Sequence, residues 1–156
     1  MKWRRLVVCL GSALALAGVT HAADREVGTW KINLAKSKYS PPELAPKSAV
    51  VKIESVENGI KVIVDTVDST GKSVHYDYSV KYDGKDYPVK GDLNRDATAA
   101  KKIDDDTLEQ VSKKDGKVTT TNRIVVSRDG MSRTQTTTGT DARGRTIDNV
   151  VFWDRQ

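Results

Sequence analysis

The chain has 156 residues, and its 26 lysines and arginines outnumber its 21 aspartates and glutamates, which gives a formal net charge of +5. Lys2, Arg4 and Arg5 lie at the very start, so 23 basic and 21 acidic residues remain after residue 22. So weak a positive balance argues against a nucleic-acid-binding protein, and the single cysteine, Cys9, excludes an intrachain disulfide.

Residues 1–22 have the parts of a secretory signal peptide. A basic start is followed by an apolar stretch over residues 6–19, and Thr20 and Ala22 are small residues at the positions that a signal peptidase reads. The apolar stretch is too short for a membrane span. We therefore expect cleavage near Ala22, a periplasmic or secreted protein, and one mature domain over residues 23–156 without a membrane-spanning segment.

The mature chain opens with a predicted strand, Gly28-Thr29-Trp30-Lys31-Ile32. Gly28 allows close approach of a neighbouring segment, and Trp30 is a large apolar anchor. The next residues, 34–48, contain Pro41, Pro42 and Pro46, three of the four prolines of the chain. Because proline interrupts helices and favours extended backbone, we expect a long surface loop over residues 34–48.

From residue 49 onward, turn sequences recur about every dozen residues, the spacing of an all-β domain. The turns are Asn58-Gly59, Ser69-Thr70-Gly71, Asp83-Gly84, Asp104-Asp105, Asp115-Gly116, Asp129-Gly130 and Asp141-Ala142-Arg143-Gly144. The segments between them are rich in valine, isoleucine, threonine and tyrosine, as strands are. We predict a single antiparallel up-and-down meander of about eight to ten strands, in which the first and last strands pair to close a barrel.

Alternation of apolar and polar residues assigns the faces of the strands. In 73–82 the predicted inner face consists of Val74, Tyr76, Tyr78, Val80 and Tyr82. In 118–127 it consists of Val118, Thr120, Asn122, Ile124 and Val126. In 146–154 it consists of Ile147, Asn149, Val151 and Trp153.

Two short motifs carry a resemblance to a known family. Gly28-Thr29-Trp30 resembles the Gly-x-Trp that opens the calycin group, the lipocalins and intracellular fatty-acid-binding proteins, and the closing run over residues 150–155 resembles the last strand of that group. Two further runs, Asp83-Gly84-Lys85-Asp86-Tyr87-Pro88 and Gly139-Thr140-Asp141-Ala142-Arg143-Gly144, resemble small secreted bacterial proteins with a lipocalin-like domain. The resemblance implies a barrel with a small hydrophobic or amphipathic ligand, and it implies that Arg155 packs on Trp30.

The chain departs from the fatty-acid-binding proteins at two places. The proline-bearing loop over residues 34–48 replaces their helical lid, and Val151 and Trp153 stand where the resemblance would place a carboxylate-binding Arg-x-Tyr. The resemblance therefore favours the fold more than a fatty-acid ligand.

The predicted inner faces combine aromatic and aliphatic residues with a few polar groups, which is typical of a small-molecule pocket. The candidate ligand-binding residues are Tyr76, Tyr78, Asn122, Gln135, Asn149 and Trp153. An interior filled by side chains is equally compatible with this composition. Whether Arg123 and Arg133 point inward or outward decides between a neutral and an anionic head group.

Catalytic and metal-binding patterns are weak. The mature chain has one histidine, His75, on the polar face of its predicted strand, and it has no Gly-x-Ser-x-Gly motif. Asp104-Asp105-Asp106 lacks the spaced oxygen ligands and the glycine of a calcium loop. We predict no enzymatic activity, no cofactor, no metal and no nucleic-acid partner, and a monomer is the expected state.

The sequence thus favours an exported, non-enzymatic barrel that binds a small, largely apolar molecule. The alternative is a filled barrel that acts through its surface or through residues 34–48 as a protein-interaction or inhibitory module. A cavity lined by Tyr76 and Tyr78 favours the first hypothesis. A packed interior with Tyr39 and Leu44 exposed favours the second.

Overall fold

The computed structural model describes residues 24–156 of the chain. The predicted signal peptide over residues 1–22 and its cleavage near Ala22 lie outside the described residues. Within residues 24–156, none of the helical structure is long and apolar enough to cross a membrane.

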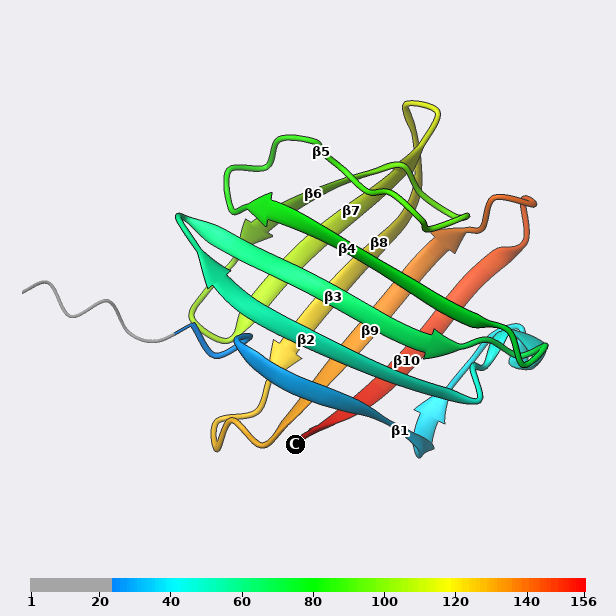
Figure 1. The fold of residues 1–156 in the computed structure, drawn as a ribbon, viewed down its shortest axis with the longest axis horizontal. Helices are drawn as coiled ribbons and strands as arrows, with labels where there is room; N and C mark the ends of the chain where they lie inside the picture. Colours follow the sequence, from blue (N-terminus) through cyan, green and yellow to red (C-terminus); the bar gives the residue numbers. More distant parts are fainter. Residues whose placement is uncertain (1–23) are drawn as a thin grey trace, which may run out of the picture.

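The described part of the chain is an antiparallel meander of ten strands (Figure 1). The strands are β1 (Gly28–Lys38), β2 (Ser48–Val56), β3 (Gly59–Val67), β4 (Ser73–Lys81), β5 (Tyr87–Pro88), β6 (Ala97–Lys102), β7 (Thr107–Lys114), β8 (Lys117–Val126), β9 (Ser132–Thr140) and β10 (Thr146–Arg155). Their order in the sheet is β4-β3-β2-β1-β10-β9-β8-β7-β6-β5. The predicted all-β meander, with its first and last strands paired, is confirmed, and each predicted turn joins two strands.

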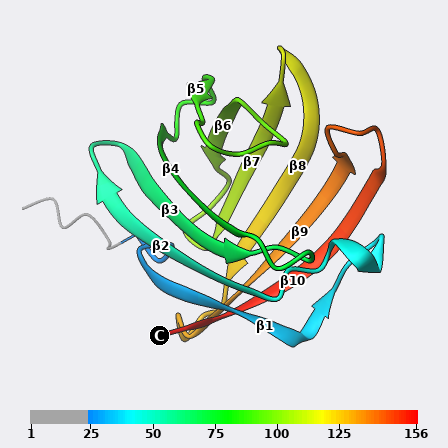
Figure 2. The same cartoon turned by 45° about the vertical axis from the view of Figure 1, so that its right-hand side comes forward.

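The sheet curls into a nearly closed barrel whose two edges are β4 and β5 (Figure 2). The segment 89–96 between β5 and β6 lies against β4. At Gly91 the contact is so close that a Cβ built on this glycine would lie 3.1 Å from the Cβ of Tyr76. Arg95 Nη2 also donates to the hydroxyl of Tyr76 at 3.2 Å. Side-chain contacts therefore cover the gap that backbone hydrogen bonds leave between the edge strands.

The first strand extends beyond its predicted end. Its start pairs with β2 and its middle with β10, where Ile32 faces Trp153, and it continues through an irregularity to Lys38 opposite Val150. Ser37 bridges the irregular stretch, because its Oγ donates to Asn33 O at 2.7 Å and accepts from Phe152 N at 3.0 Å. The prediction of a loop from residue 34 was wrong, because this pairing to β10 keeps the backbone extended past Asn33.

The true connection between β1 and β2 contains a single turn of 3-10 helix, η1 (Pro42–Leu44). Proline at the first helical position suits such a turn, since its missing N–H would have no intrahelical partner there. The side chain of Leu44 is half-buried and faces the interior of the barrel.

The predicted inner faces hold with one exception. In β4 and β10 the residues predicted to face inward are the more buried ones, and β8 agrees from Asn122 to Val126. Val118 is instead 58% exposed. The ladder to β7 shifts between Ser112 and Lys113, so Thr119 is an extra residue in β8 and the side-chain alternation inverts beyond it.

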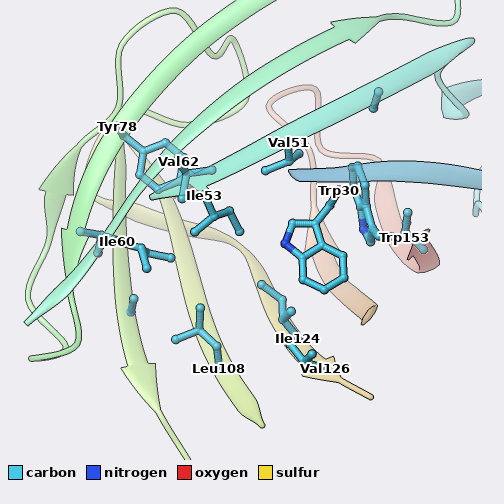
Figure 3. Close-up of a cluster of buried hydrophobic side chains, with 14 of the residues drawn as sticks. Trp30, Val51, Ile53, Ile60, Val62, Tyr78, Leu108, Ile124, Val126 and Trp153 are labelled. Carbon is cyan, nitrogen blue, oxygen red and sulfur yellow. The ribbon is translucent and has the colours of Figure 1, made fainter. Parts of the chain in front are cut away.

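The buried hydrophobic side chains of the core include Trp30 and Trp153 (Figure 3), and we call the end of the barrel where these two rings lie the floor. Trp30, the largest fully buried side chain, lies beside Trp153 there, and Leu108, Ile124 and Val126 of β7 and β8 complete the cluster.

Candidate functional site

The interior of the barrel is hollow, with a cavity of about 910 Å³. Its rim is formed by η1, the β3–β4 turn, the segment 89–96 and the β9–β10 turn. All six residues predicted to face a ligand line it: Tyr76, Tyr78, Asn122, Gln135, Asn149 and Trp153. A cavity of this size lies within the range of volumes that small-molecule pockets have.

One wall of the cavity is aliphatic and aromatic. It comes from β2, β3 and β4, whose inward positions alternate regularly because each strand is long and uninterrupted. The lining residues of this wall are Val51, Ile53, Ile60, Val62, Val64, Tyr76 and Tyr78. Such a surface favours contact with an apolar molecule through burial of its area from water.

The opposite wall carries a small amide and hydroxyl group cluster from β8 and β9. Gln135 Nε2 donates to Asn122 Oδ1 at 3.0 Å and to Thr137 Oγ1 at 3.3 Å, and the Thr137 hydroxyl donates to Asn122 Oδ1 at 2.6 Å. Asn149 Oδ1 on β10 accepts from Ser40 N at 2.9 Å. These contacts hold the polar side chains in fixed orientations along the cavity, as a binding wall requires.

The floor of the cavity contains a buried ion pair. Arg133 Nη1 on β9 donates to Glu26 Oε2 at 3.0 Å, and each side chain is 4% exposed. The Arg133 guanidinium lies 5.2 Å from the ring centroid of Trp30 and 5.0 Å from that of Trp153. The pair is thus enclosed by two indole rings, which favour a cation at this distance.

Burial and pairing act in opposite directions on these two groups. Burial raises the pKa of Glu26, while the charge of Arg133 and its hydrogen bond to Glu26 lower it. Burial also lowers the pKa of Arg133, and Glu26 opposes that change. A guanidinium starts so far above neutral pH that it remains protonated, so the floor holds a positive charge beside the Glu26 carboxyl.

Three polar atoms at this floor have no hydrogen-bond partner among the described residues: Glu26 Oε1, Arg133 Nε and Trp153 Nε1. All three residues line the cavity. Trp30 differs, because its Nε1 donates to the backbone carbonyl of Glu26 at 2.9 Å. Buried polar atoms are normally satisfied, so three unpartnered atoms in neighbouring side chains are an unusual feature of this floor.

A second arginine enters the cavity near its rim. Arg95, in the segment 89–96, donates through Nε to Asp92 Oδ2 at 2.9 Å and through Nη2 to Tyr76. Its guanidinium lies 4.9 Å from the ring centroid of Tyr78. Burial raises the pKa of the Tyr76 hydroxyl to about 12, although the charge of Arg95 opposes that shift.

Of the residues predicted to be structural, Gly28 and Arg155 lie beside the buried ring of Trp30. The Arg155 guanidinium lies 4.2 Å from the centroid of the Trp30 ring and donates to the carbonyl of Val27 at 2.8 Å. Gly28 has a φ of +146°, and a Cβ built there would lie 2.1 Å from Arg155 Nη1. Gly28 therefore makes room for the side chain that covers the tryptophan.

Comparison with solved structures finds a barrel of similar fold. Zebrafish ileal bile acid-binding protein, solved in complex with cholic acid, superposes with a TM-score of 0.52 at 15% identity, over 85% of this chain and 99% of that chain. The chain has a calycin-like fold. Neither a protein-family model nor a curated protein sequence matches it.

The sequence left open whether Arg123 and Arg133 point into the calycin-like barrel or away from it. Arg133 points inward and Arg123 is exposed on the outside. The sequence could have placed Arg133 inside the barrel, because it lies two residues before Gln135 on β9 and alternate residues of a strand share a face. Val151 and Trp153, at the positions of the expected Arg-x-Tyr, are buried and carry no charge.

Glu26 and Arg95 were not predicted to belong to the site. Glu26 precedes the first strand, and Arg95 lies in the irregular segment between β5 and β6. Neither position has an alternation that would assign its side chain to a face.

The histidine considered for catalysis lies away from the cavity. His75 Nδ1 is 2.6 Å from Asp65 Oδ1, and both side chains are well exposed on the outer surface of β3 and β4. Among residues 24–156, no group of three His, Cys, Asp or Glu side chains is placed to hold a metal ion.

Proposed function

We propose that this chain is an exported binding protein that holds a small, largely apolar molecule inside its barrel without changing it chemically. The observation that carries the proposal is the hollow interior, about 910 Å³, with an aliphatic and aromatic wall facing a few fixed polar groups. This composition is that of small-molecule sites in general. The signal-like residues 1–22 support export to the periplasm or to the exterior.

Two further observations favour binding over the alternative of a filled barrel that acts through its surface. Tyr39 packs against the core cluster and Leu44 lines the cavity, so neither offers the exposed apolar surface that a docking loop needs. The zebrafish protein of similar fold was solved with cholic acid, which supports the use of such a barrel for a small amphipathic molecule.

The test is native mass spectrometry of the mature protein, purified from its own secretory compartment without a delipidating step. We expect a reproducible extra mass on the wild-type protein. Val64→Trp places an indole in the cavity, because Val64 lines it, and this variant is expected to carry no extra mass. Ile63→Trp is the matched control, because Ile63 pairs with Asp77 and points to the outer face of the same strand. This variant is expected to retain the extra mass.

A clean apo mass for the wild-type protein, together with no uptake of the neutral dye Nile red, would count against the binding function. Far-ultraviolet circular dichroism of both tryptophan variants separates a blocked cavity from a failure to fold.

A further inference from the structure

The floor of the cavity contains both kinds of hydrogen-bonding group without a partner among the described residues, and neighbouring side chains cover each of these atoms. Glu26 Oε1 is an acceptor, and the N–H groups of Arg133 Nε and Trp153 Nε1 are donors. The residues lie close together, because Glu26 is bonded to Arg133 and Arg133 lies over the Trp153 ring. A group that both donates and accepts would satisfy these atoms once the side chains that cover them shift to admit it, whereas a hydrocarbon end would leave them unsatisfied.

The charges that reach into the cavity are compensated by charges of this chain. Arg133 is paired with Glu26, and Arg95 with Asp92 at 2.9 Å. At the rim, Arg145 Nη2 lies 2.6 Å from Asp141 Oδ2, and the remaining arginine of the lining, Arg143, is exposed. Glu43 and Asp68 add two acidic groups to the same rim.

A carboxylate ligand fits this charge distribution poorly. It carries acceptors alone, so it gives nothing to Glu26 Oε1. At the floor it would share Arg133 with the carboxyl of Glu26, and two like charges in one buried site oppose each other. Burying such a charge without a cation of its own is costly.

We propose that the ligand is an uncharged amphiphile whose hydroxyl group enters first and reaches the floor. There the hydroxyl donates to Glu26 Oε1 and accepts from Trp153 Nε1, while the apolar part lies against the wall from β2, β3 and β4. This inference rests on the proposed binding function and names the chemical class of its ligand.

The direct test compares 1-decanol with decanoate, two probes that have the same chain length and differ in the charge of the end group. Binding to the delipidated mature protein at neutral pH is measured by native mass spectrometry and calorimetry. We expect 1-decanol to bind at least about tenfold more tightly, the size of one good hydrogen bond or one charge mismatch. Equal or tighter binding of decanoate would overturn the inference.

Trp153→Phe tests the floor with little change to the fold. The Trp153 N–H has no partner among the described residues, so its removal breaks no bond within them, and the phenyl ring keeps most of the packing. We expect the affinity for 1-decanol to fall by about threefold to tenfold, with an unchanged melting temperature. An unchanged affinity would mean that the three atoms bind water instead of ligand, and would overturn the inference.

Trp30→Phe is the matched control on the neighbouring indole. Trp30 Nε1 already donates to the carbonyl of Glu26, so this variant is expected to lose stability while keeping the preference for the alcohol. A loss of preference in Trp30→Phe equal to that in Trp153→Phe would indicate a general disturbance of the core and contradict the assignment.

Glu26→Gln examines the charge compensation. With the carboxylate gone, Arg133 lacks its counterion, and decanoate is expected to gain at least about tenfold relative to 1-decanol. Glu54→Gln removes the same charge outside the barrel, where Glu54 pairs with Lys52 at 2.8 Å, and leaves the ratio unchanged. An unchanged ratio in a folded Glu26→Gln protein would contradict the proposal.

Failure of this inference is distinguishable from failure of the binding function. If neither probe binds but the protein carries an extra mass from its own compartment, the hydroxyl assignment is wrong and the binding function stands. If no mass is carried and Nile red is not taken up, the binding function itself is wrong.

Discussion

The floor and the rim of the cavity use the same chemistry at different depths. Each has an arginine bonded to a carboxylate and placed over two aromatic rings. At the floor the side chains of Arg133 and Glu26 are 4% exposed. Near the rim those of Arg95 and Asp92 are 13% and 14% exposed, and Arg95 comes from an irregular segment instead of a strand.

The difference teaches that similar ion pairs have different roles. A fully buried pair is costly to break, because removing one partner leaves a charge without water or counterion. A pair beside the rim regains water when one partner leaves, and its segment can rearrange. We therefore regard the floor as the more rigid part of the barrel and the rim as the adjustable part.

The largest effect is expected from Arg133→Met. It leaves the carboxyl of Glu26 buried without its partner, and the free energy of unfolding should fall by about 3–5 kcal/mol. Urea denaturation followed by tryptophan fluorescence measures the loss, since Trp30 and Trp153 both lie beside the pair.

The double variant Glu26→Met/Arg133→Met is the control for that loss. Replacing a whole buried ion pair by apolar side chains is often neutral, so the double variant should recover most of the stability. A double variant as unstable as Arg133→Met alone would show that packing, not the orphaned charge, sets the cost.

What could be predicted from the sequence depends on whether a feature is set by neighbouring residues or by distant contacts. Alternation is a local property, because residues two apart on a strand share a face. It therefore predicts the inner faces of β4 and β10, including Tyr76, Asn149 and Trp153, which line the cavity. The meander followed from the regular turns. Val118 was misplaced because one extra residue at Thr119 inverts the alternation, and no local signal marks that bulge.

The site residues that escaped prediction depend on distant contacts. Arg95 is held by Tyr76, 19 positions earlier, and by Asp92 within an irregular segment. Glu26 lies under Trp30 because the chain before β1 folds back toward the floor. Whether the interior is hollow or filled depends on the number and curvature of the strands together, which no single stretch of sequence carries.

A smaller effect is expected from Arg95→Met. The variant loses the bonds to Asp92 and Tyr76, but the freed carboxylate is beside the rim and can be hydrated, so we expect a loss of about 1.5–3 kcal/mol. Hydrogen exchange should also show faster exchange of backbone amides in 89–96, because the segment loses its anchor to β4.

Arg143→Met is the matched control for Arg95→Met. Arg143 also lines the cavity but is exposed on the β9–β10 turn, so its replacement should change stability by less than about 0.5 kcal/mol. If Arg95→Met lowers the free energy of unfolding as much as Arg133→Met does, depth in the barrel does not distinguish the two ion pairs, and the rim is as rigid as the floor.

The smallest effect is expected from Tyr76→Phe, and it depends on pH. Near neutral pH the variant loses one hydrogen bond from Arg95, worth about 0.5–1.5 kcal/mol. Burial raises the pKa of Tyr76 from 10 to about 12, so between these values the unfolded chain releases a proton that the folded chain keeps. Stability is therefore unaffected by this group below pH 10 and falls as pH rises toward 12.

Urea denaturation at a series of pH values measures that fall. Tyr76→Phe should make it less steep, without abolishing it, because burial also raises the pKa of Tyr39 to about 12. Tyr39→Phe should reduce the slope in a similar way, and the two variants combined should reduce it further. An unchanged slope in Tyr76→Phe would mean that the hydroxyl beneath Arg95 is hydrated in the folded protein, so that the rim is open to water as far down as β4.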